Sequence, residues 1–72
     1  MIGQQLYAGI KGSSKYASQA DWHRTHGWPY PFPVSLQLDP MGYVVKGGVG
    51  GQYRMEDVEL YVIEDGQQIR VA

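Results

Sequence analysis

Glycine and proline divide this chain into short pieces. Ten Gly and four Pro stand among 72 residues, so no helical pattern longer than about three turns runs uninterrupted. A helical bundle is therefore disfavoured, and short strands joined by tight turns are expected. The whole chain, residues 1–72, has room for one domain with one core.

Composition favours a folded, soluble domain. Hydrophobic residues make up 43% of the chain and charged residues 18%, which suffices for a packed interior and is too little charge for a disordered tail. There is no Cys, which excludes a disulfide framework and a thiolate metal site. Apolar runs are short, and the first residues lack the pattern of a signal peptide. We therefore expect a cytoplasmic protein that does not enter a membrane.

The charge distribution argues against strong electrostatic binding of nucleic acid. Residues 1–48 carry four Lys and Arg against two Asp, whereas residues 49–72 carry two Arg against five Asp and Glu. The sequence pI is about 6.0, whereas proteins that neutralise phosphates usually have a basic face and a high pI.

Two β-hairpins are predicted from turn chemistry. Asp65-Gly66 suits a type I′ turn between the alternating segments 58–64 and 67–72. This turn places Glu64 opposite Gln67, and the following opposed pairs are Tyr61 with Arg70, Val62 with Ile69, and Leu60 with Val71. Asp39-Pro40-Met41-Gly42 suits a type I turn between the strands 34–38 and 43–46.

The remaining segments complete a small β-rich fold. Alternation in residues 6–10 predicts a first strand, and residues 18–25 predict a short helix with Ser18 as N-cap and Gly27 as the stop. One face of an extended segment would carry Trp28, Tyr30, Phe32, Val34, Leu36 and Leu38 toward the core. The prolines between them indicate an edge or a polyproline-like approach. These elements predict a mainly β fold: a small antiparallel barrel of about five strands, with a helix near residues 18–26.

Residues 38–61 carry a family resemblance. The turn Leu38-Asp39-Pro40-Met41-Gly42-Tyr43 and the later run from Tyr53 to Tyr61 resemble the later strands of Src-homology-3-like small barrels, in which a hairpin leads through a 3₁₀ turn into a closing strand. Among these barrels the chain is most similar to plasmid-borne type II dihydrofolate reductases. Their active pore uses a Val-Gln-Ile-Tyr strand from four identical subunits, whereas the matching positions here are Gly50-Gly51-Gln52-Tyr53. The resemblance implies the barrel and self-association, but not the reductase activity.

Two motifs that suggest small-ligand chemistry are incomplete. The Gly-rich run at residues 46–52 lacks the Lys-Ser or Lys-Thr end of a phosphate-binding loop, so a flexible hairpin loop is expected. Asp21, His23 and His26 lie close in sequence, but no fourth zinc ligand accompanies them. We predict no metal, no cofactor and no catalytic residues.

The densest aromatic segment is the predicted binding surface, because Trp, Tyr and Arg dominate interaction hot spots and a small barrel cannot bury nine aromatic side chains. The predicted binding residues are Trp22, His23, Arg24, His26, Trp28, Tyr30 and Phe32. We predict a non-enzymatic interaction module that binds a protein partner or a second copy of itself through this aromatic and proline-rich surface.

Two alternatives remain open at this point. A weak nucleic-acid binder would stack bases on the same aromatic side chains and attract phosphates with Lys11, Lys15, Arg24 and Lys46. An enzyme at an oligomer pore, as the reductase resemblance implies, would rely on Lys46, Gln52 and Tyr53.

Overall fold

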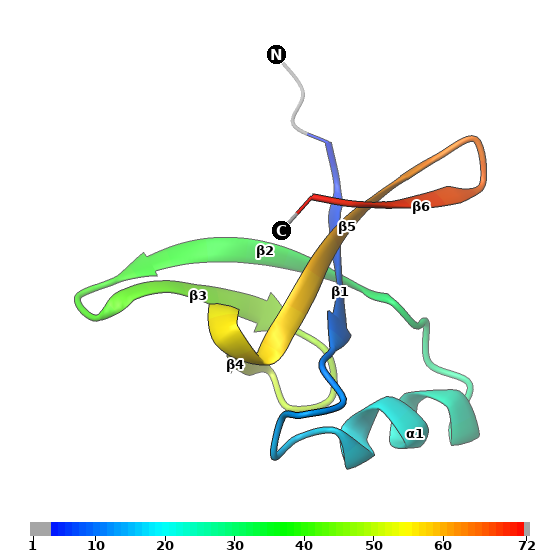
Figure 1. Cartoon of the computed structure of the whole chain (residues 1–72), viewed down its shortest axis with the longest axis horizontal. Coiled ribbons are helices and arrows are strands. Elements are labelled where there is room, and N and C mark those ends of the chain that lie inside the picture. Colours follow the sequence, from blue (N-terminus) through cyan, green and yellow to red (C-terminus); the bar gives the residue numbers. More distant parts are fainter. Residues whose placement is uncertain (1–3, 72) are drawn as a thin grey trace.

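The computed structural model describes residues 4–71, which fold into one antiparallel sheet of six strands with one α-helix and one 3₁₀ turn (Figure 1). The mainly β prediction is therefore confirmed. The elements in chain order are β1 (Leu6–Ile10), α1 (Ser18–Thr25), β2 (Phe32–Asp39), β3 (Gly42–Gly47), β4 (Gln52–Arg54), η1 (Met55–Asp57), β5 (Val58–Glu64) and β6 (Gln67–Arg70).

The sheet is open rather than closed into the expected barrel of about five strands. Its strand order is β4-β3-β2-β1-β5-β6, so the first strand lies between β2 and β5 and the edges are β4 and β6. Closure would need hydrogen bonds between the two edge strands, β4 and β6. β4 is only three residues long before η1 begins, and within residues 4–71 no pairing joins it to β6.

Both predicted hairpins are confirmed. In the C-terminal hairpin, Glu64 pairs with Gln67 and Val62 with Ile69, and the Val71 N–H donates to the Leu60 carbonyl (2.8 Å). Asp65 and Gly66 have φ angles of 51° and 78°, the positive values that a type I′ turn requires. In the other hairpin, β2 and β3 are paired from Asp39 opposite Gly42 to Val34 opposite Gly47.

The predicted helix forms over Ser18–Thr25, but Ser18 is not its N-cap. The N-cap is Ala17, which is itself helical in conformation and makes no side-chain cap. The reason is that turns lead directly into the helix, with the Ala17 N–H donating to the Ser14 carbonyl. Gly27 follows the helix with a φ of 72° and ends it as expected. No helix in residues 4–71 is long and apolar enough to cross a membrane.

The core lies on one face of the sheet, and α1 contacts it through His23, whose ring stacks on Phe32. Its buried members are Ala8, Ile10, Phe32, Val34, Val45, Tyr53, Val58 and Leu60. Only Phe32 and Val34 of the predicted apolar stripe at residues 28–38 belong to it. Residues 28–31 precede the strand, and Leu36 and Leu38 lie beyond the last pairing of β2 with β1, Leu6 opposite Val34. Pro33 lies where β2 is paired with β1 but not yet with β3, which agrees with the expected edge position of proline.

Candidate binding cleft and aromatic cluster

The structure divides the predicted aromatic surface into a buried part and an exposed part. His23 and Phe32 are buried, and their rings stack with centroids 4.8 Å apart. Trp28 meets His23 edge-on at 5.5 Å and is 47% exposed. His23 and Phe32 therefore belong to the interior of the protein. Trp28 lies at the surface and packs against this buried pair through His23.

His23 is a structural histidine with both ring nitrogens engaged. The Val49 N–H donates to Nε2 at 3.1 Å, so Nε2 carries no proton and the proton of the neutral ring is on Nδ1. Nδ1 in turn donates to the Pro29 carbonyl at 3.1 Å. One side chain thus joins α1 to the loop after β3 and to the segment before β2.

Trp22, His26 and Trp28 form a small cluster on the outside of α1. The Trp22 and His26 rings stack at 4.1 Å, and Trp22 meets Trp28 edge-on at 4.8 Å. His26 Nδ1 donates to the Trp22 carbonyl at 2.9 Å, so the ring is held where it stacks. One face of Trp22 is therefore covered by His26 and is not a free stacking platform.

The possible metal ligands do not converge. The Asp21 carboxylate pairs with Arg24 at 3.1 Å, and both nitrogens of His23 are used by backbone groups. Within residues 4–71 no group of three or more His, Asp or Glu side chains is arranged to hold a metal ion.

The Gly-rich run forms the hairpin loop between β3 and β4, and it is tied to α1. The Gly50 N–H donates to the Tyr53 hydroxyl at 3.0 Å, and that hydroxyl donates to Gln19 Oε1. Tyr53 points into the core, whereas Gln52 is exposed beside its paired residue Lys46. The three residues considered for a pore enzyme are therefore split between the two faces of the sheet.

Alkaline pH is expected to weaken the fold through Tyr53. Burial raises the pKa of its hydroxyl above the ordinary value of 10.0, so the unfolded chain releases this proton more readily than the folded chain. The stabilisation is fully present below pH 10 and declines as pH rises from there toward the folded-state pKa. Urea unfolding measured from about pH 8 to 11 should show a smaller decline for Tyr53→Phe than for wild type. Equal declines would contradict this assignment.

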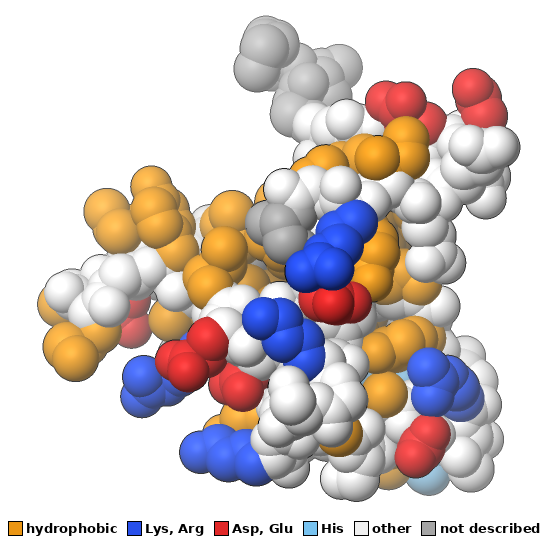
Figure 2. All heavy atoms as spheres, viewed as in Figure 1, with side chains coloured by type: hydrophobic (Ala, Val, Ile, Leu, Met, Phe, Trp, Pro, Cys, Tyr) orange, Lys and Arg blue, Asp and Glu red, His pale blue; other side chains and the backbone are white. Residues whose placement is uncertain are grey.

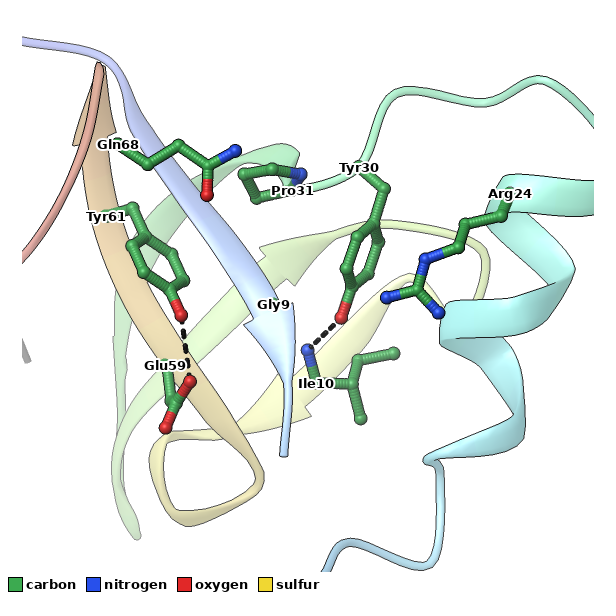
Figure 3. Close-up of a pocket in the computed structure, with 8 residues that line it drawn as sticks. All are labelled: Gly9, Ile10, Arg24, Tyr30, Pro31, Glu59, Tyr61 and Gln68. Carbon is green, nitrogen blue, oxygen red and sulfur yellow. Dashed lines mark hydrogen bonds between the residues drawn. The ribbon is translucent and has the colours of Figure 1, made fainter. Parts of the chain in front are cut away.

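A cleft lies between the end of α1 and the outer face of β5 and β6 (Figure 3). Its volume is about 430 Å³. The lining residues are Gly9, Ile10, Arg24, Tyr30, Pro31, Glu59, Tyr61 and Gln68. Arg24 and Tyr30 of the predicted surface thus meet residues from distant parts of the chain.

One wall of the cleft is built on Tyr30. The Ile10 N–H donates to the Tyr30 hydroxyl at 2.8 Å. This bond satisfies a backbone N–H at the end of β1, beyond the last residue of β1 that pairs with β2. The Arg24 guanidinium lies over the Tyr30 ring, 4.8 Å from its centroid, in cation–π geometry. The ring is therefore fixed at its hydroxyl and covered on one face.

The opposite wall is built on Tyr61. Its hydroxyl donates to Glu59 at 2.8 Å, and the other oxygen of Glu59 pairs with Arg70 at 3.3 Å. The hydrogen bond to Glu59, followed by burial, raises the pKa of Tyr61 above the ordinary value of 10.0.

Gly9 of β1 forms the floor between the two tyrosine walls. A Cβ at this position would lie 3.4 Å from the Tyr30 hydroxyl oxygen and 3.4 Å from Tyr61 Cε2. Gly9 thus lies within contact range of both tyrosines, and its missing side chain leaves the floor of the cleft open.

Part of this cleft was not predicted as a site from the sequence. Gly9, Glu59 and Tyr61 enter it because β1 pairs with β5, and Gln68 enters it because β6 pairs with β5. The predicted pairing of Tyr61 with Arg70 is confirmed. This pairing was the one feature of the sequence that pointed to Tyr61 as a surface residue of this region. The basic residues considered for phosphate binding are not gathered here: Lys15 lines a separate hollow with Glu56 and Asp57.

Residues 38–61 contain the expected succession of hairpin, 3₁₀ turn and following strand. Membership of the Src-homology-3-like class stays a prediction, because the sheet is open. Comparison with protein-family models, with curated proteins and with solved structures finds no match to this chain.

Proposed function

We propose that this chain is a non-enzymatic interaction module that binds an extended segment of a protein partner in the cleft between Arg24 and Tyr61. The observation that carries the proposal is the pair of tyrosine rings on either side of Gly9. Grooves lined by aromatic rings are a recurrent means of holding extended and polyproline-like peptides.

The two tyrosine walls of the cleft are preorganised. Both tyrosine hydroxyls are already hydrogen-bonded within the fold, to the Ile10 N–H and to Glu59. Rings held in this way lose little conformational entropy when a ligand arrives. Tyr and Arg are also enriched among the residues that dominate binding energy.

The charges at the rim indicate what the bound segment carries. Arg24 lines one wall, and one of its nitrogens contacts Asp21, whereas guanidinium has five N–H donors in all. On the other wall, Glu59 is engaged by Tyr61 and Arg70. The fitting ligand is a segment with a proline or aliphatic side chain between the rings and a carboxylate beside Arg24.

Gly9→Ala is expected to weaken peptide binding without harming the fold. The added methyl would occupy the cleft floor at ordinary contact distances, and alanine is favoured over glycine within a strand by roughly 0.5–1 kcal/mol. Peptides selected from a displayed random library on the wild-type chain would be measured by calorimetry. Affinity should fall about 10-fold or more for Gly9→Ala, a loss of about 1.4 kcal/mol.

Gly12→Ala is the matched control, because no atom lies within 4 Å of a Cβ placed there. It should bind the selected peptides as wild type does. If no peptide is selected, or if the selected peptides bind Gly9→Ala as tightly as wild type, the cleft is not the binding site.

A further inference from the structure

A second surface, separate from the cleft, is apolar and exposed. It lies on the outer part of the β2–β3 hairpin and on the end of β6 away from its turn, and Figure 2 shows hydrophobic side chains extending from the projecting β2–β3 hairpin toward the middle of the molecule. We call it the hairpin face. Its members are Leu36, Leu38, Met41, Tyr43, Ile69 and Val71, which are from 40% to 91% exposed.

Strand register shows that the hairpin face continues the core. Leu36 is opposite Val45, which is fully buried, and Leu38 is opposite Tyr43 two positions further along the ribbon. Directly opposed residues of an antiparallel pair share a face. Ile69 opposes Val62, and Val71 bonds to Leu60 of the core. On this side of the sheet the central residues are thus buried in the core, whereas those on the β2–β3 hairpin and at the end of β6 are exposed.

The fold itself leaves this side bare. Within residues 4–71, pairing of β1 with β2 ends at Leu6 opposite Val34, and pairing of β3 with β4 ends at Val44 opposite Arg54. Beyond these points β2 and β3 form a two-stranded ribbon. Such a ribbon is marginally stable in water unless an apolar face is covered.

We propose that a second copy of this chain covers the hairpin face, forming a symmetric dimer. From their exposed fractions, the six residues present on the order of 600 Å² per copy. A two-fold contact that buried all of this area would reach roughly 1,200 Å² in total, the lower bound for a stable interface. None of the six is charged, although Met41 and Tyr43 also line a hollow that contains both signs of charge, from Asp39, Arg54 and Glu56. A two-fold axis places the same patch on both sides of the contact.

The dimer is independent of the proposed peptide binding. Along β5 and β6 the cleft residues Glu59, Tyr61 and Gln68 alternate with those of the core side, Leu60, Val62 and Ile69. Successive residues of a strand point to opposite faces, so a dimer through the hairpin face leaves the cleft open. Failure of either proposal leaves the other standing.

The test is the mass in solution across a concentration series, measured by sedimentation velocity. Wild type should pass from 8.1 kDa to twice that mass as concentration rises. Leu38→Glu should raise the dissociation constant by about 100-fold or more, because a carboxylate would be buried without a partner. Leu38 is 68% exposed in the single chain, so its replacement should leave the circular dichroism spectrum unchanged.

Ile63→Glu is the matched control: Ile63 is also an exposed aliphatic strand residue, at 37%, but pairs with Gln68 on the opposite side of the sheet. It should dimerise like wild type. A wild-type mass that stays at 8.1 kDa up to millimolar concentration would overturn the proposal, as would equal effects of the two substitutions.

A second measurement locates the contact. Because the chain has no Cys, a single Met41→Cys substitution can carry a spin label. In a mixture with unlabelled, isotope-enriched chain, line broadening should fall on residues of the hairpin face. Broadening confined to the cleft would overturn the proposed geometry.

Discussion

His23→Ala is expected to destabilise the fold by roughly 3–5 kcal/mol, most of the stability that a domain of this size can have. The substitution removes a fully buried ring that stacks on Phe32. It also leaves the Val49 N–H and the Pro29 carbonyl without their side-chain partner. We therefore expect the variant to be largely unfolded at 37 °C, as measured by circular dichroism and by urea unfolding followed through Trp fluorescence.

His26→Ala is the matched control, three residues further along the chain at the C-cap of α1. His26 is exposed, and it stacks on Trp22 at the surface. Its loss should cost about 1 kcal/mol or less. A third variant, His23→Phe, keeps a ring in place of the imidazole but removes both hydrogen bonds, and should fall between the two. If His23→Ala were as stable as His26→Ala, the role assigned to the buried ring would be wrong.

Gly47→Ala is expected to be the second most damaging change, at roughly 3–4 kcal/mol. Gly47 has a φ of 147°, and a Cβ there would lie 2.6 Å from the Pro33 carbonyl oxygen and 2.9 Å from Val34 Cγ1. The first of these is a backbone atom in the paired part of β2, which cannot move aside without breaking the strand. The midpoint of urea unfolding measures the loss.

Gly51→Ala separates backbone strain from collision. Gly51 ends the loop that follows Gly47 and has a φ of 79°, but a Cβ there meets no atom within 4 Å. Gly51→Ala should lower the free energy of unfolding by only about 1–2 kcal/mol, the cost of placing an alanine in the left-handed conformation. If the two substitutions lowered the free energy of unfolding equally, the close approach of Gly47 to the β2 backbone would not be the cause of the loss.

The parts of the fold set by neighbouring residues could be predicted from the sequence. Asp65-Gly66 determines a turn by its own backbone preferences, and the register of the hairpin follows from the turn. The helix boundary at Gly27 is local in the same way. Sheet closure is not local, because it depends on whether the edge strands β4 and β6, which belong to different parts of the chain, meet in space. The turn residues of each hairpin fix only the pairing within that hairpin.

The candidate site shows the same division. An aromatic cluster near residues 22–32 is evident from composition, but which rings are buried depends on where α1 docks. His23 and Arg24 are adjacent in the chain, yet one lies in the interior and the other lines the cleft. The opposite wall comes from Tyr61, whose relation to Tyr30 follows only from the pairing of β1 with β5.

The central position of β1 also bears on how the chain is assembled. On one side β1 meets β2, and on the other side Tyr7 pairs with Tyr61, 61 − 7 = 54 positions later in a chain of 72. The β2–β3–β4 meander and the β5–β6 hairpin each need only short loops to close, whereas joining them through β1 carries a larger loop-closure entropy. During synthesis β1 is thus paired on both sides only after β5 has been made, and until then one of its edges stays open.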